Sequence, residues 1–131
     1  MEIWDYNKYS VGYESIDKQH ERLFSIIGEV YDKIITADKS SKAPLLIELL
    51  SYTNNHYSDE IQFLLLKNVD NESIIDHIKE HQNNINNLID IIRKSLIDGD
   101  LIIVDVAILL NDWISNHIIK YDIPTFRLIG K

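Results

Sequence analysis

The sequence predicts an all-α protein, an up-down-up-down antiparallel four-helix bundle that follows an N-terminal arm. Three observations support this fold: long segments with apolar residues three and four apart, short breaks between them, and little turn material, since 131 residues include four Gly and two Pro. With 45% hydrophobic and 26% charged residues, the composition is typical of a globular protein. We therefore expect residues 1–131 to form a single domain.

Each expected element follows from a run of the apolar pattern or from a break in it. Residues 1–11 are expected to form the arm, whose Trp4 should pack on the bundle. The helices are expected at approximately residues 13–37, 42–66, 71–98 and 101–122. Helices of this length with such short connections lie side by side and antiparallel.

Proline and short polar residues mark the expected helix ends. Pro44 suits the first turn of the second helix, because proline has no backbone N–H to place there. Asp70 or Asn71 can cap the start of the third helix with a side-chain oxygen. Pro124 disfavours α geometry at the residue before it, so we expect the last helix to end at Asp122.

The composition excludes several classes of partner and site. The chain has 21 acidic and 13 basic residues, a net charge of -8, so it offers no basic surface for nucleic acid or an anionic membrane. It has no cysteine, which excludes disulfides, thiolate metal sites, iron–sulfur clusters and a cysteine nucleophile. The longest apolar run is interrupted by Asp105 and is too short to span a bilayer, and the acidic N-terminus is not a signal peptide. We therefore expect a cytoplasmic protein.

The histidines do not lie on the polar faces of the expected helices. All five lie on the apolar stripes, together with Glu60 and, less cleanly, Asp122; they are His20, His56, His77, His81 and His117. Burying seven polar groups costs roughly several kcal/mol each unless a partner satisfies them. A divalent cation does so, because neutral imidazole donates a lone pair and carboxylate supplies charge. The set predicts a buried metal site; the alternative is a polar core held by hydrogen bonds alone.

The spacings indicate how these side chains converge. Two pairs are four residues apart and project from one face of their helix, namely His56 with Glu60 and His77 with His81. An ideal helix separates residues five apart by about 140°, so His117 and Asp122 converge only where the helix departs from ideal geometry. We expect a fraying last turn before Pro124 to swing the carboxylate inward.

Seven donors are too many for one ion, since structural zinc takes about four ligands and catalytic zinc about three plus water. If Glu60 and Asp122 each bridge two metals, and an oxo or hydroxo group also bridges them, the imidazoles complete one six-coordinate and one five-coordinate site. Imidazole-rich sites suit iron, copper, zinc or nickel, and six-coordination by nitrogen and oxygen favours iron. We therefore expect two iron ions, Fe2+ or Fe3+, with a bridging oxo or hydroxo group.

Five short motifs carry a resemblance to a known family. They are IDKQHERLF around His20, HYSDE from His56, HIKEH from His77, HIIKYD from His117, and WISNHI, which overlaps the last of these. In this order they resemble the hemerythrins, in particular their single-domain bacterial members, the bacteriohemerythrins. The resemblance covers the whole chain, including the arm with Trp4, and all seven ligand positions are present in order.

The resemblance implies a role for each donor. It implies that His77, His81 and His117 bind the six-coordinate iron, that His20 and His56 bind the five-coordinate iron, and that Glu60 and Asp122 bridge them. It implies that O2 binds reversibly at the open position of the second iron, for oxygen transport, storage or sensing, and that the protein is not an enzyme. The alternative is a di-iron oxidase, a peroxidase or a nitric-oxide-handling enzyme. A protein partner or electron donor, and a choice between monomer and weak homo-oligomer, stay open.

The resemblance also implies an apolar pocket for O2, walled by Leu23, Trp113, Ile114 and Ile118, which keeps water and protons away from the irons. Two positions depart from the family pattern. Tyr57 stands where the family usually has Phe and brings a hydroxyl toward the pocket. Asn84 stands where an aromatic residue often follows the third-helix histidines. A hydroxyl that donates a proton at the site would support the enzyme alternative.

Overall fold

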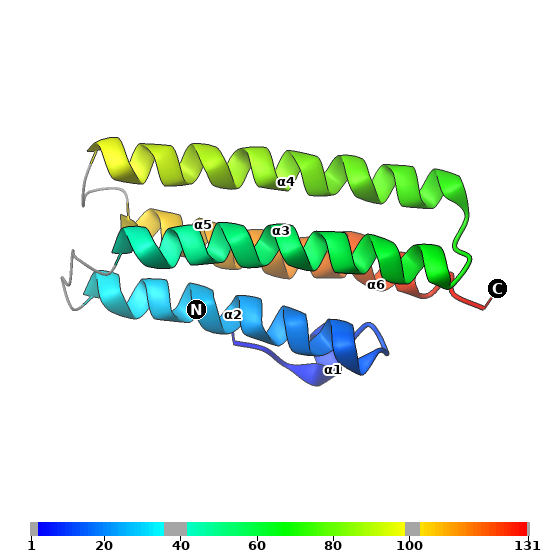
Figure 1. The fold of residues 1–131 in the computed structure, drawn as a ribbon. Helices are drawn as coiled ribbons and strands as arrows, with labels where there is room; N and C mark the ends of the chain where they lie inside the picture. Colours follow the sequence, from blue (N-terminus) through cyan, green and yellow to red (C-terminus); the bar gives the residue numbers. More distant parts are fainter. Residues whose placement is uncertain (1–2, 36–41, 99–102, 131) are drawn as a thin grey trace.

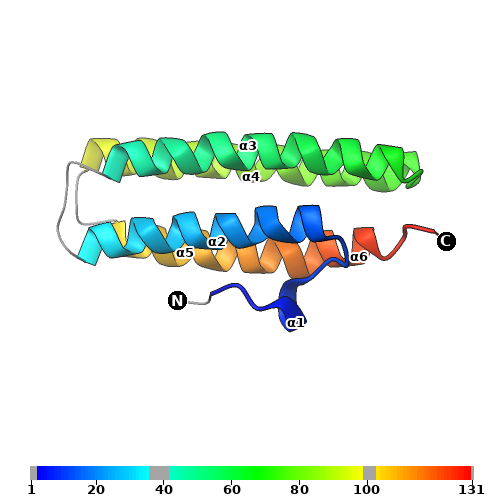
Figure 2. The same ribbon diagram turned by 60° about the horizontal axis from the view of Figure 1, so that its bottom comes forward.

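The long helices of the computed structural model run antiparallel, as the apolar periodicity predicts (Figure 1). The structure describes residues 3–35, 42–98 and 103–130. The long helices are α2 (Glu14–Ile35), α3 (Lys42–Leu66), α4 (Asn71–Asp98) and α5 (Ile103–His117). Figure 2 shows α3 and α4 in one layer and α2 and α5 in the other. The predicted all-α bundle is confirmed; the expected helix end at residue 37 and start at residue 101 lie outside the described residues.

The N-terminal segment includes a short helix, α1 (Tyr6–Tyr9), which begins after Asp5 caps it by accepting a hydrogen bond from the Asn7 backbone N–H at 3.0 Å. Trp4 lies beside this helix, with ring centroids 6.0 Å from Tyr9 and 6.2 Å from Phe24 of α2. The segment therefore packs against α2, and the prediction that Trp4 contacts the bundle is confirmed.

Asp17, near the start of α2, attaches this segment to the bundle. Its carboxylate accepts a hydrogen bond from the Ser10 hydroxyl at 2.6 Å and another from the Val11 backbone N–H at 2.9 Å. Gly12 follows with φ +88°, a left-handed conformation that glycine adopts without steric cost. The chain can therefore turn sharply from the arm into α2.

The core has two apolar clusters. The larger includes Leu23 and Ile27 of α2, Leu49 of α3, Leu88 of α4 and Ile114 of α5. The smaller consists of Ile16, Leu64, Val69, Ile74 and Phe126. On each long helix the buried histidines lie between a residue of one cluster and a residue of the other. The polar residues thus form a layer across the bundle, with apolar side chains on both sides of it.

The C-terminal end of the bundle differs from expectation. After α5 the chain forms a π turn (Ile118–Asp122), closed by a hydrogen bond from the Ile123 N–H to the Ile118 carbonyl, and continues as α6 (Ile123–Phe126). The prediction that the helix ends at Asp122 is wrong, because Ile123 keeps α geometry at φ -58° and ψ -50°. Pro124 is accommodated because it lies in the first turn of α6, where a backbone N–H needs no helical partner.

Among the described residues, no helix is long and apolar enough to cross a membrane.

We expect Asp17→Ala to loosen the arm and destabilise the protein. The substitution removes a charged acceptor from two hydrogen bonds, so the free energy of unfolding should fall by about 2 kcal/mol in urea denaturation. Glu21→Ala, at an exposed position one turn further along α2, is the matched control and should change it by less than about 0.5 kcal/mol. Equal stability of the two variants would contradict the assigned role of Asp17.

Candidate metal centre

The structure brings all seven predicted ligands into one buried cluster. They are His20 of α2, His56 and Glu60 of α3, His77 and His81 of α4, His117 of α5, and Asp122 at the end of the π turn. Each of them is at most 5% exposed. No two successive helices could build this cluster alone, because its members come from all four long helices and the π turn.

The seven side chains form two groups of donor atoms that share two members. One group joins Glu60 and Asp122 to His77, His81 and His117, and the other joins the same two carboxylates to His20 and His56. Within each group the donor atoms lie within 4.8 Å of one another. We call them the three-histidine group and the two-histidine group.

The two oxygens of Glu60 face different groups. Its Oε2 lies 3.3 Å from Nε2 of His20 and 3.1 Å from Nε2 of His56, both in the two-histidine group. Its Oε1 lies 3.1 Å from Nε2 of His81 and also contacts Nε2 of His77, both in the three-histidine group. A carboxylate placed this way can bridge two cations.

Asp122 divides its oxygens in the same way. Its Oδ2 lies 3.1 Å from Nε2 of His20. Its Oδ1 lies 3.0 Å from Nε2 of His77 and 3.1 Å from Nε2 of His117. Both acidic side chains of the cluster therefore contact both histidine groups.

The π turn explains how His117 and Asp122 meet although they are five residues apart. In a π turn the backbone hydrogen bond joins residues i and i+5, so side chains five apart lie on one side of the helix. The expectation of a fraying last turn is wrong: the chain stays helical, and Asp122 is fully buried. A wider regular turn, rather than a loose end, brings the carboxylate inward.

The electrostatics of the cluster favour ionised carboxylates. Burial lowers the pKa of His20 and of His77, but hydrogen bonds to Asp122 and Glu60 outweigh burial and raise each pKa to about 9. Burial likewise lowers the pKa of His117, but the charge of Asp122 and a hydrogen bond to it raise the pKa to about 10. Burial raises the pKa of Glu60, but hydrogen bonds with the histidines, His20 first, hold it well below the usual range. Two negative charges thus sit in the interior and attract cations.

Several inward-facing atoms of the cluster lack a hydrogen bond of acceptable geometry. They are both carboxylate oxygens of Asp122 and the Nε2 atoms of His56 and His117. Buried polar atoms without partners are costly, whereas a cation satisfies several lone pairs at once. The donor set, made of imidazole nitrogens and carboxylate oxygens, is consistent with a di-iron site.

The outward Nδ1 atoms of three histidines have partners that hold the rings. Nδ1 of His56 lies 2.6 Å from Oε1 of Gln19, so its N–H donates outward and leaves the Nε2 lone pair facing the cluster. Nδ1 of His77 lies 3.2 Å from the hydroxyl of Thr125. The sequence analysis missed both partners. Gln19 directly precedes His20 in the IDKQHERLF motif, which is the only signal that could have found it, and Thr125 lies beyond the expected helix end.

Nδ1 of His117 faces the two residues that depart from the family pattern. Asn84 is buried and places its amide nitrogen 3.0 Å from Nδ1 of His117 and 3.2 Å from the hydroxyl of Tyr57. The Tyr57 hydroxyl is thus engaged by Asn84 and not by Glu60 or Asp122. Burial raises the pKa of Tyr57 well above its usual value, so the hydroxyl keeps its proton.

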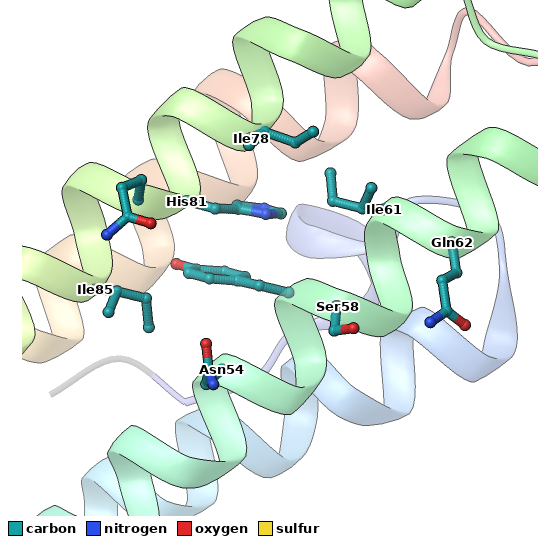
Figure 3. A pocket seen from close by; sticks show the side chains of 9 residues that line it. Asn54, Ser58, Ile61, Gln62, Ile78, His81 and Ile85 are labelled. Atoms are coloured by element: carbon teal, nitrogen blue, oxygen red, sulfur yellow. The ribbon is translucent and has the colours of Figure 1, made fainter.

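The ring of Tyr57 stacks on that of His81, with centroids 3.7 Å apart and planes 3° apart. Both rings line a surface cleft of about 330 Å³ between α3 and α4. Figure 3 shows His81 in this cleft, with Ile61, Ile78 and Ile85 around it. His81 is therefore the ligand candidate that lies against the outer edge of the bundle.

The predicted wall residues lie in the larger apolar cluster. Leu23, Ile114 and Ile118 are fully buried there, and Trp113 packs against them. Leu23 lies about one turn along α2 from His20. Tyr57 is buried too, but it contacts His81 instead of this cluster.

Comparisons with known proteins agree with this geometry. No protein-family model matches the chain. A bacteriohemerythrin from Clostridium acetobutylicum is 26% identical over 127 residues, which cover 93% of this chain and 96% of that protein. A crystal structure of a hemerythrin mutant superposes with a TM-score of 0.86 at 21% identity, covering all of this chain and 98% of that one. The homologue along nearly the whole chain, the shared fold and the buried histidine–carboxylate cluster place this chain in the hemerythrin family.

Proposed function

We propose that this chain is a non-heme di-iron protein that binds O2 reversibly, for transport, storage or sensing. The single observation that carries the proposal is the division of the buried donors into two unequal groups that share Glu60 and Asp122. Two ions held this way receive three and two imidazoles. The ion with fewer imidazoles keeps room for an external ligand.

In this proposal each donor has one position. His77, His81 and His117 hold one iron, His20 and His56 hold the other, and Glu60 and Asp122 bridge them together with an oxo or hydroxo group. A pair of ferrous ions supplies the electrons and the open coordination position that reversible O2 binding needs.

The chain's own residues keep the ions in place and water away from them. Gln19 and Thr125 hold the rings of His56 and His77 through their Nδ1 atoms. Leu23, Ile114 and Ile118, with Trp113 packed against them, supply a dry apolar wall. A dry wall limits the protons that reach the irons, and a shortage of protons favours release of O2 over its reduction.

The enzyme alternative receives no support from Tyr57. Its hydroxyl accepts a hydrogen bond from Asn84 at 3.2 Å, so it is not placed as a proton donor at the carboxylates. Members of the hemerythrin family are typically O2 carriers without enzymatic activity, and the similarity to a bacteriohemerythrin favours the same role here.

The direct test uses the protein loaded anaerobically with Fe2+. We expect two irons per chain by metal analysis and, on exposure to air, a new visible absorption band that disappears under vacuum. Repeated cycles should return the same band, because the wall keeps the iron from oxidising permanently. One zinc per chain, or irreversible bleaching in the first cycle, would contradict O2 carriage.

We expect His77→Ala to lower the iron content sharply and to remove the stabilisation that iron gives. Metal binding and folding are linked when ligands come from several helices, so the melting temperature of the iron-loaded variant should approach that of the iron-free protein. Lys79→Ala, at an exposed position on the same helix, is the control and should load iron like the original protein. Two irons per chain in His77→Ala would refute the assignment of this ligand.

We expect Gln19→Leu to weaken Fe2+ binding by about 10–100-fold, because His56 loses the acceptor that holds its Nδ1 proton. Competition with a chelator measures the affinity. Gln62→Leu, an exposed glutamine on α3, serves as the comparison and should leave the affinity unchanged. If both variants bind Fe2+ equally, Gln19 has no part in orienting His56.

A further inference from the structure

We propose that Tyr57 and Asn84 form a positioning pair for His117: the Asn84 side-chain carbonyl accepts the Nδ1 proton of His117 when a metal occupies Nε2, and the Tyr57 hydroxyl fixes the amide in that orientation. The inference rests on the proposed di-iron site and assigns a role to two residues outside its ligand set. Tyr57 comes from α3, Asn84 from α4 and His117 from α5, so the network joins three helices.

Burial makes this network selective. Tyr57 is 4% exposed and Asn84 is 5% exposed. One terminal atom of the Asn84 amide faces both partners, at 3.2 Å from the Tyr57 hydroxyl and 3.0 Å from Nδ1 of His117. Because an unpaired buried amide, hydroxyl or ring N–H is costly, the three groups must agree on which donates and which accepts.

The proton inventory decides that agreement once a metal is bound. A metal takes the lone pair on Nε2 of His117, so the ring proton lies on Nδ1, which then donates. The Asn84 atom that faces it must be the carbonyl oxygen. The two ends of an amide have nearly the same shape, so a half rotation of the side chain places Oδ1 where Nδ2 is drawn. That oxygen has two lone pairs and accepts from Nδ1–H of His117 and from the Tyr57 hydroxyl together.

No other described side chain competes well for this proton. The nearest carboxylate oxygen, Oε1 of Glu80, lies 3.9 Å from Nδ1 of His117, which is too long for a hydrogen bond. Asn84 is therefore the acceptor within reach among the described residues.

The hydroxyl and the ring of Tyr57 have separable roles. The ring stacks on His81 at 3.7 Å, and a phenylalanine would stack in the same way. Only the hydroxyl gives Asn84 its second partner, because it can donate a hydrogen bond to the carbonyl oxygen. Tyr57 and Asn84 together therefore hold two imidazoles of the three-histidine group, His81 by stacking and His117 by hydrogen bonding.

The test compares the original protein with Asn84→Leu, Asn84→Asp and Tyr57→Phe after anaerobic loading with Fe2+. Competition with a chelator gives the Fe2+ affinity. Proton NMR in H2O and D2O follows the shifted, exchangeable ring N–H signals of the iron-bound histidines. Melting of the iron-free proteins reports packing alone. Asn83→Leu, at the exposed neighbouring position, is the matched control.

We expect Asn84→Leu to weaken Fe2+ binding about 10–100-fold and to speed exchange of one ring N–H signal, leaving those of His56 and His77 unchanged. Asn84→Asp keeps an acceptor oxygen and should restore slow exchange. Tyr57→Phe should speed exchange of the same signal with a smaller loss of affinity. Asn83→Leu should match the original protein in every measurement.

Three results would overturn the proposal. The first is an Asn84→Leu variant with the original affinity and exchange rates. The second is an Asn84→Asp variant that exchanges as fast as Asn84→Leu, since packing alone would then explain both. If Asn84→Leu does not fold, unchanged exchange in Tyr57→Phe is decisive. If the original protein fails to bind two irons, the proposed function and this inference both fall; if it binds two and only the variants disagree, the inference alone falls.

Discussion

Two ionised carboxylates buried at one level of a helical bundle constrain the rest of this structure. Glu60 and Asp122 are fully removed from water, and each directs one oxygen to one set of imidazoles and the other oxygen to the second set. Such charges are tolerated in an apolar interior only where positive partners surround them. The positions of the histidines on all four long helices follow from that requirement.

The rest of the fold isolates this polar layer. Apolar clusters lie on both sides of it along the helices, and the arm adds a cover on one flank, where the rings of Trp4 and His20 are 6.5 Å apart. A bundle that filled the layer with leucine would gain stability, since buried ionic groups seldom stabilise more than well-packed apolar ones. The chain thus gives up stability at its centre in return for a donor set that metal ions can complete.

The sequence was sufficient to predict the donor set, because helical periodicity relates spacing to direction. Residues four apart, such as His77 and His81, must share a face in any regular α-helix. Spacing was not sufficient at His117 and Asp122, where a π turn replaces the α turn and no local residue signals it. Thr125 escaped detection for the same reason, since Pro124 indicates a helix end that the π turn and α6 avoid. Gln19 was missed because its partner lies 37 positions away in sequence, and such pairings depend on how helices pack.

The π turn also sets the rotational phase of everything that follows it. A residue added to or removed from an α-helix turns the downstream part by about 100° around the axis. With the π turn in place, Phe126 packs beside Ile16 and Leu64, and Thr125 reaches His77. A single-residue deletion within residues 118–121 would keep an acid near the cluster but swing both of these side chains to other faces. The length of this short stretch is therefore tuned for two neighbours at once, so chains aligned with this one should vary here in residue type before they vary in length.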